Sequence, residues 1–169
     1  MRKSIGLVLQ EPFLYHGTIA SNIRMYHEEL TDEEIRQAAA FVDVADFIES
    51  LPGGYDHPVT ERGSTLSTGQ RQLLAFARTI AAQPKILILD EATANIDQET
   101  EEMIQNSLKK MRQGRTTIAI AHRLSTIQDA DCIYVLDKGK IIESGNHDQL
   151  IALGGTYKKM YDLQAGMMK

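Results

Sequence analysis

The chain has 169 residues, of which 43% are hydrophobic, and this suits one globular domain with a buried core. No apolar run approaches the ~18 residues of a membrane-spanning helix, and the formal net charge of −5 argues against a nucleic-acid-binding surface. Cys132 is the single cysteine, which excludes an internal disulfide, and no histidine spacing typical of a zinc site occurs.

The first part of the chain is predicted to be mostly helical after one short strand. Thr31 and Glu34 have capping-box spacing, in which each side chain binds the other residue's backbone amide, and this marks the start of a helix. The expected elements are a strand at residues 4–9, helices at 31–42 and 44–50, and a polar loop at 55–65.

The clearest helix signal begins at Ser67, where Gln70 completes a second capping box, and Pro84 prevents the helix from continuing. Residues 85–89 (KILIL) are a short apolar run between breakers, which predicts a buried strand. Strands alternating with helices after residue 66 predict an α/β fold, a parallel sheet with flanking helices joined to a small helical subdomain. The remaining expected elements are a helix from Asp97 to Gly114, a buried strand at 116–121 that ends at His122, strands at 132–136 and 140–143, and helices at 146–153 and 155–164.

Three polar positions follow predicted strands, namely Gln10, the pair Asp90 and Glu91, and His122. Ligands of parallel α/β sheets gather at the carboxyl ends of the strands, so these side chains could face one site. Asp90 is placed to hold Mg²⁺, and Glu91 to polarise a water for attack on a phosphate, with His122 fixing the water or the phosphate. The alternative is that one acid caps the following loop while the other is solvated.

A second candidate site lies at the start of the helix that Ser67 opens. Small residues there leave backbone amides open at the positive end of the helix dipole, which favours an anion. Ordinary N-capping by Ser67 explains the same residues, and both interpretations stay open. The residues of this candidate site are Ser67, Thr68, Gly69 and Gln70.

Two long stretches, LSTGQRQLLAFARTIAAQPKILILDEATANID and TTIAIAHRLSTIQDADCIYVLDKGKIIESGNHDQLI, resemble the nucleotide-binding domain of ATP-binding cassette (ABC) transporters. Residues 66–70 resemble the family signature, 86–90 the Walker B strand and 94–97 the D-loop. The resemblance implies ATP and Mg²⁺ as ligands and a P-loop-NTPase-like sheet, with residues 11–83 as the helical subdomain and 84–169 with 1–10 as the core. It implies that Glu91, His122 and Gln10 are catalytic and that Asp90 and Gln10 are metal ligands. It also implies that the nucleotide is contacted by Ser67, Thr68, Gly69, Gln70 and Asp97.

The resemblance extends to the exporter branch of the family at two places. Residues 13–23 (FLYHGTIASNI) resemble the segment that contacts the membrane domains, and residues 60–63 (TERG) resemble the exporter x-loop. The implied function is an ATP-hydrolysing motor of an exporter at the cytoplasmic face of the cell membrane. Its implied partners are the transmembrane domains and a second ABC ATPase domain, with no nucleic acid.

The phosphate-binding sequence G-x-x-x-x-G-K-[ST] does not occur in these 169 residues. The resemblance implies that it lies upstream, so we expect the chain to be a soluble C-terminal part of a larger domain, truncated on its N-terminal side. Missing strands would leave a sheet edge and an apolar face open, and we therefore expect the chain to form oligomers.

Thr68 stands where the family usually has glycine, and residues 94–97 read ANID where SALD is common. A side chain at position 68 could crowd a γ-phosphate, which would suit one half of a heterodimeric exporter with one weakened site. The alternative is that threonine is tolerated there, so homodimer and heterodimer both stay open.

Two other functions are compatible with parts of the pattern. DNA-repair and chromosome-structure ATPases share the signature and Walker B motifs, but they carry long heptad coiled coils, and no sustained heptads occur here. A non-catalytic dimerisation or interaction fragment is the other alternative, and the intact Glu91 and His122 argue against it for the parent protein.

We predict that the isolated chain neither binds ATP tightly nor hydrolyses it. Positioning and charge stabilisation supply nearly all of the catalysis in phosphoryl transfer, and this chain carries no phosphate-cradling loop. Isothermal titration calorimetry with Mg-ATP should show no binding in the micromolar range, and a micromolar dissociation constant would contradict the prediction.

Overall fold

The computed structural model describes residues 4–90, 98–121 and 123–166, without the side chains of residues 98, 99 and 125. It contains two compact units, Met1–Ile120 and Ala121–Lys169. The sequence-based division into residues 11–83 and a core stays a prediction. No helix of the described residues combines the length and the apolar character that crossing a bilayer requires.

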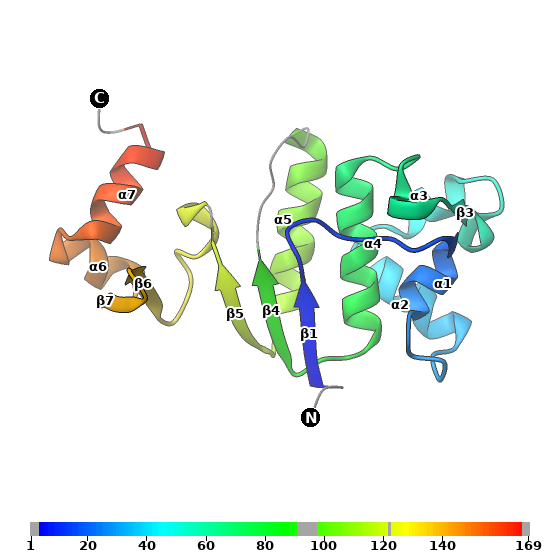
Figure 1. Cartoon of the computed structure of the whole chain (residues 1–169), viewed down its shortest axis with the longest axis horizontal. Coiled ribbons are helices and arrows are strands. Elements are labelled where there is room, and N and C mark those ends of the chain that lie inside the picture. Colours follow the sequence, from blue (N-terminus) through cyan, green and yellow to red (C-terminus); the bar gives the residue numbers. More distant parts are fainter. Residues whose placement is uncertain (1–3, 91–97, 122, 167–169) are drawn as a thin grey trace. The chain divides into compact units, whose positions relative to one another are not determined.

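The first unit is organised around a three-stranded parallel sheet in the order β1 (Ile5–Val8), β4 (Ile86–Asp90), β5 (Thr116–Ile120) (Figure 1). The pairing is in register, so Leu7 lies beside Ile88, and Ile88 lies beside Ile118. This arrangement confirms the predicted α/β class with a parallel sheet.

Two long helices, α4 (Thr68–Ala81) and α5 (Gln98–Arg112), pack against one face of this sheet. Leu87 and Leu89 of β4 point into the same buried cluster as Phe76 of α4 and Ile104 of α5. The strands alternate buried and less buried residues, as a sheet covered on one face does. Helix α4 begins at Ser67 with both hydrogen bonds of the predicted capping box.

The small helical part comprises α1 (Ile19–Arg24), α2 (Asp32–Phe41) and α3 (Ala45–Ser50). The capping box of Thr31 and Glu34 is present at the start of α2, as predicted. Helix α5 is tied to this part because the buried Ser107 hydroxyl donates to the Val42 carbonyl at 2.9 Å and Lys110 pairs with Asp43 at 2.5 Å.

The predicted polar loop over residues 55–65 is wrong in part, because much of it is folded. Two turns of 3-10 helix, Gly54–Asp56 and Glu61–Gly63, flank β3 (Pro58–Val59), which pairs antiparallel with β2 (Gly17–Thr18). Tyr55 and Val59 are buried in the main core. Strand β3 pairs with β2, which lies about 40 residues earlier in the chain. Local sequence patterns do not reveal a partner at that separation.

Strand β5 was expected to be buried, and the structure contradicts this. Ile118 and Ile120 are 56% and 55% exposed, as is Leu7 of β1 at 54%. These residues lie on the face opposite α4 and α5, so an apolar run is present but one side of it is uncovered.

The second unit contains a hairpin of β6 (Ile133–Asp137) and β7 (Lys140–Gly145), then α6 (His147–Leu153) and α7 (Thr156–Gln164). A short 3-10 turn, Leu124–Thr126, precedes them. The Glu143 carboxylate of β7 accepts from the amides of Thr156 and Tyr157 at the start of α7, and these hydrogen bonds lower its pKa. The four main elements agree with the sequence-based prediction.

Candidate functional site

Two predicted site residues lie at the same edge of the sheet. Asp90 is the last residue of β4, and Gln10 follows β1 by two residues. Strand β5 ends at Ile120, which is paired with Asp90. All three strands are parallel, so their carboxyl ends meet at one edge, which is where α/β sheets bind ligands (Figure 1).

Three other predicted site residues, Glu91, Asp97 and His122, lie outside the described residues. Glu91 directly follows Asp90 in the sequence, and His122 follows the last residue of β5 by two positions. Their convergence with Asp90 and Gln10 therefore stays a prediction.

The side chains present at this edge fit a magnesium ion in donor chemistry. The Asp90 carboxylate is half-buried, and Gln10 adds an amide oxygen, so both offer the hard oxygen ligands that Mg²⁺ prefers. The described residues include no cluster of three or more metal-binding side chains. Mg²⁺ at phosphate sites characteristically uses one or two carboxylates and keeps several waters, so a single described carboxylate agrees with this chemistry.

The N-terminus of α4 combines a cap with open donors. The Ser67 hydroxyl accepts from the Gln70 amide at 3.1 Å, and the Gln70 side chain accepts from the Ser67 amide at 2.9 Å. The amides of Thr68 and Gly69 have no acceptor among the described residues. N-capping therefore accounts for Ser67 and Gln70 while leaving donors for an anion, so the two sequence-based interpretations are compatible.

Arg71, one turn into α4, binds three acceptors that precede it. Its Nη1 donates to the Leu66 carbonyl at 2.6 Å and to the Gly63 carbonyl at 3.4 Å, and its Nη2 donates to the Thr68 hydroxyl at 3.1 Å. The guanidinium thus joins the TERG segment (residues 60–63) to the first residues of α4.

Arg78 makes a second network from the same helix, two turns further on. Its Nη1 donates to the Phe13 carbonyl at 2.9 Å, its Nε to the Asn22 carbonyl at 2.7 Å and its Nη2 to the Asn22 side chain at 3.1 Å. Asn22 is 2% exposed, and its side chain accepts from the Tyr15 amide and donates to the Tyr15 carbonyl. Burial lowers the pKa of the Arg78 guanidinium. Residues 13–22 are therefore fastened to α4.

Sequence reasoning missed both arginines. A signal existed, because residues seven apart lie on one face of a helix, and two arginines on a helix as largely buried as α4 call for acceptors. The acceptors of Arg78 are 56 and 65 residues away in the sequence, so the pattern could not identify them.

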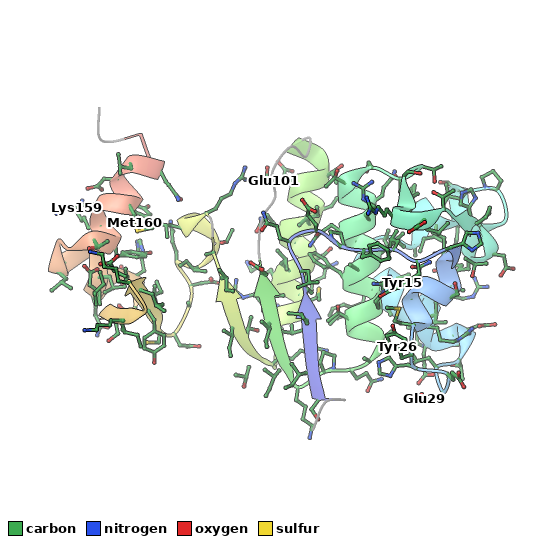
Figure 2. The ribbon with its side chains drawn as sticks, in the orientation of Figure 1. Tyr15, Tyr26, Glu29, Glu101, Lys159 and Met160 are labelled. Carbon is green, nitrogen blue, oxygen red and sulfur yellow. The ribbon has the colours of Figure 1, made fainter. Side chains whose placement is uncertain are left out.

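The segment that Arg78 holds presents an exposed aromatic surface. Phe13 and Tyr15 pack edge to face with centroids 4.9 Å apart and are 42% and 44% exposed. Tyr26 is 81% exposed, and a hydrogen bond with Tyr15 raises the pKa of its hydroxyl (Figure 2). Aromatic side chains with a polar tip are favoured at protein interfaces, so this surface suits a protein partner.

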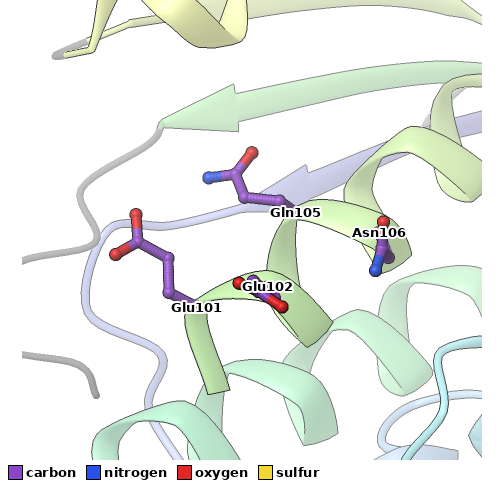
Figure 3. A pocket seen from close by; sticks show the side chains of 4 residues that line it. All are labelled: Glu101, Glu102, Gln105 and Asn106. Atoms are coloured by element: carbon purple, nitrogen blue, oxygen red, sulfur yellow. The ribbon is translucent and has the colours of Figure 1, made fainter. Parts of the chain in front are cut away.

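A shallow hollow of about 420 Å³ lies on α5, lined by Glu101, Glu102, Gln105 and Asn106 (Figure 3). Its lining contains none of the predicted site residues. Two carboxylates repel a triphosphate rather than attract it, so we assign no nucleotide to this hollow.

Comparison with known proteins gives consistent matches. A family model described as "ABC transporter" matches residues 1–94. The chain is 77% identical over 168 residues to a putative ABC transporter ATP-binding protein of Streptococcus pneumoniae serotype 4, covering 99% of this chain and 29% of that protein. It is 55% identical over 166 residues to a probable multidrug resistance ABC transporter ATP-binding/permease protein of Bacillus subtilis, covering 98% of this chain and 25% of that protein.

A solved structure agrees with these matches. A bacterial Atm1-family ABC exporter with ATP bound superposes with a TM-score of 0.87 and 44% sequence identity, covering 97% of this chain and 29% of that chain. The chain thus spans less than a third of the length of the proteins it matches.

Arg78→Lys should lower the free energy of unfolding by about 2 kcal/mol, because one ammonium cannot replace three donors directed at Phe13 and Asn22. Urea unfolding at one fixed protein concentration measures this. Arg36→Lys is the matched control, since Arg36 is exposed and only lies over the Tyr55 ring, and it should change stability by less than about 1 kcal/mol. Equal effects of the two substitutions would contradict the assigned importance of the Arg78 network.

Proposed function

This chain belongs to the ABC transporter family, and we propose that it is part of the ATP-hydrolysing motor domain of an exporter. The observation that carries the proposal is the position of Gln10 and Asp90 at one sheet edge, at the carboxyl ends of parallel strands. The open amides at the start of α4 provide a second, separate group of donors for phosphate.

In the proposed site, different residues bind the metal ion, activate the attacking water and contact the nucleotide. Asp90 and Gln10 would hold Mg²⁺ through oxygen atoms, and the ion would supply positive charge that offsets the phosphate charge of ATP. Glu91 orients and polarises the attacking water, and His122 and Gln10 fix the water and the γ-phosphate. The nucleotide contacts are assigned to Ser67, Thr68, Gly69, Gln70 and Asp97.

The proposed partners follow from the same assignment. Residues 13–23 and the TERG segment contact the transmembrane domains at the cytoplasmic face of the cell membrane, and the exposed aromatic surface of Phe13, Tyr15 and Tyr26 supports this. A second ABC ATPase domain, identical or not, completes each site. The bacterial relatives include a probable multidrug resistance protein and an ATP-dependent lipid A-core flippase of Saccharophagus degradans, and we propose no particular cargo.

A second candidate function applies to the 169-residue chain by itself. The uncovered sheet face carries Leu7, Ile118 and Ile120, each more than half exposed, and supports a role as a self-associating fragment without catalysis. This candidate is compatible with the proposed motor function of the complete subunit.

Glu91→Gln in the complete subunit should lower the rate of phosphate release about 100-fold or more, because a neutral amide cannot polarise the attacking water. Steady-state ATPase measurements on the purified transporter test this. Glu102→Gln, an exposed position on α5, is the matched control and should keep the wild-type rate. A complete subunit without ATPase activity, or a Glu91→Gln variant as active as wild type, would refute the assignment.

The isolated chain should form dimers or larger oligomers at high concentration. Ile118→Lys should shift the chain towards monomer, since it buries a charge in the proposed contact. Leu163→Lys, at a 61% exposed position on α7, serves as the control and should leave the assembly unchanged. Light scattering after size exclusion gives the mass, and a monomeric wild type would count against self-association.

A further inference from the structure

Thr68 has a hydrogen-bonding partner that its sequence position did not suggest. If Thr68 merely replaced glycine, its side chain would be a passive obstacle at the start of α4. The structure instead places its hydroxyl 3.1 Å from Nη2 of Arg71. The two residues are three apart on α4, so they share one face of the helix.

We propose that Arg71 is a positioning residue that clamps the TERG segment to the first residues of α4, and that Thr68 supplies one of the acceptors the clamp needs. This inference rests on the proposed function, because it assigns a coupling role to the same nucleotide-contacting end of α4.

The guanidinium of Arg71 engages three acceptors at once, and its hydrogen bond to the exposed Thr68 hydroxyl lies at the surface. Nη1 reaches the Leu66 and Gly63 carbonyls, and Nη2 reaches the Thr68 hydroxyl, so two nitrogens of one planar group bind three acceptors. A planar guanidinium is held in a more sharply defined orientation when donors on both terminal nitrogens are engaged than when one nitrogen alone is bound. Glycine at position 68 would remove the acceptor of Nη2, and the arginine would then be held on one side.

The clamp continues into the segment proposed to contact the membrane domains. Gly63 is buried at a φ of +61°, and a Cβ placed there would lie 2.9 Å from Leu14 and 3.2 Å from the Arg71 Cδ. The Arg62 amide donates to the Leu14 carbonyl at 3.1 Å. An unbroken chain of contacts therefore runs from Leu14 through the TERG segment and Arg71 to Thr68.

This placement changes the expected effect of the threonine. A hydroxyl bound to Arg71 is directed to the flank of α4, so it helps to orient the helix end that meets the nucleotide. Loosening such a positioning contact misplaces catalytic groups and lowers the rate of the chemical step. Removing an obstacle would have the opposite effect and raise the rate.

Three variants of the complete subunit separate these two possibilities by ATPase kinetics. Thr68→Val keeps the shape without the acceptor, Thr68→Gly restores the residue common in the family, and Arg71→Lys removes the planar group. The clamp predicts that all three lower kcat, on the order of tenfold, with a smaller change in KM for Mg-ATP. A Thr68→Gly variant faster than wild type, with Thr68→Val equal to wild type, would overturn the proposal in favour of an obstacle.

Hydrogen–deuterium exchange on the 169-residue chain provides a readout that needs no activity. Amides of residues 60–66 should exchange faster in Thr68→Val than in wild type, and Thr68→Ser, which keeps the hydroxyl, should retain the slow exchange. Peptides from α6 and α7 serve as the internal reference, since they lie in the other compact unit. Equal exchange at residues 60–66 in Thr68→Val and wild type would overturn the clamp.

The two experiments also distinguish this inference from the proposed function. A complete wild-type subunit without ATPase activity would contradict the proposed function, and with it the coupling role assigned to Arg71. Normal wild-type activity combined with unchanged kcat in Thr68→Val and Arg71→Lys would contradict the clamp alone.

Discussion

The parallel pairing of β1, β4 and β5 is the constraint on which the candidate site depends. Parallel strands bring their carboxyl ends to one edge, so Gln10 and Asp90 share that edge although 80 positions separate them in the sequence. Leu87 and Leu89 fix β4 against α4 and α5, and this packing sets the direction in which the strand ends. The position of the Asp90 carboxylate, the proposed metal ligand, is therefore determined by the burial of Leu87 and Leu89 on the covered face of the sheet.

Helix α4 connects the parts of the first unit. Its N-terminus carries the capping box and the open amides, its buried face packs on the sheet, and Arg71 and Arg78 bind the segments around it. The 14 residues of this helix thus join its N-terminus, through Arg71, and Phe13 and Asn22, through Arg78, to one continuous element.

The sequence predicted the elements whose causes are local. The capping boxes at Thr31 and Ser67 depend on residues three apart, and both helices begin where expected. The pair β2 and β3 and the Arg78 network were missed because their partners are distant in the chain, and periodicity does not record distance in space. Helix α1 and the Arg71 contacts were missed although their partners are local, since Thr18 and Ser21 form a capping box and the Arg71 acceptors lie three to eight residues before it. The exposure of β5 was missed for a different reason, since an apolar run shows that a strand can be buried but not how many layers cover it.

The candidate site was predicted from residue types at strand ends, and the structure shows Gln10 and Asp90 at the carboxyl ends of two paired strands, while their roles stay a prediction. The family signature was recognisable in the sequence, but the hydrogen-bonding partner of Thr68 was not. From the sequence alone, a threonine in place of glycine indicates only a larger side chain. The hydrogen bond to Arg71 required coordinates.

The buried hydroxyl of Ser107 has a mechanical consequence. Helix α5 begins one residue after Asp97, and halfway along its length Ser107 donates to the Val42 carbonyl at the end of α2. If α5 moved along its axis, the Val42 carbonyl would lose its hydrogen bond, at a cost of about 1–3 kcal/mol. Otherwise, the turn between α2 and α3 would have to move together with α5. A displacement of α5 along its axis would therefore also move the helical part formed by α1, α2 and α3.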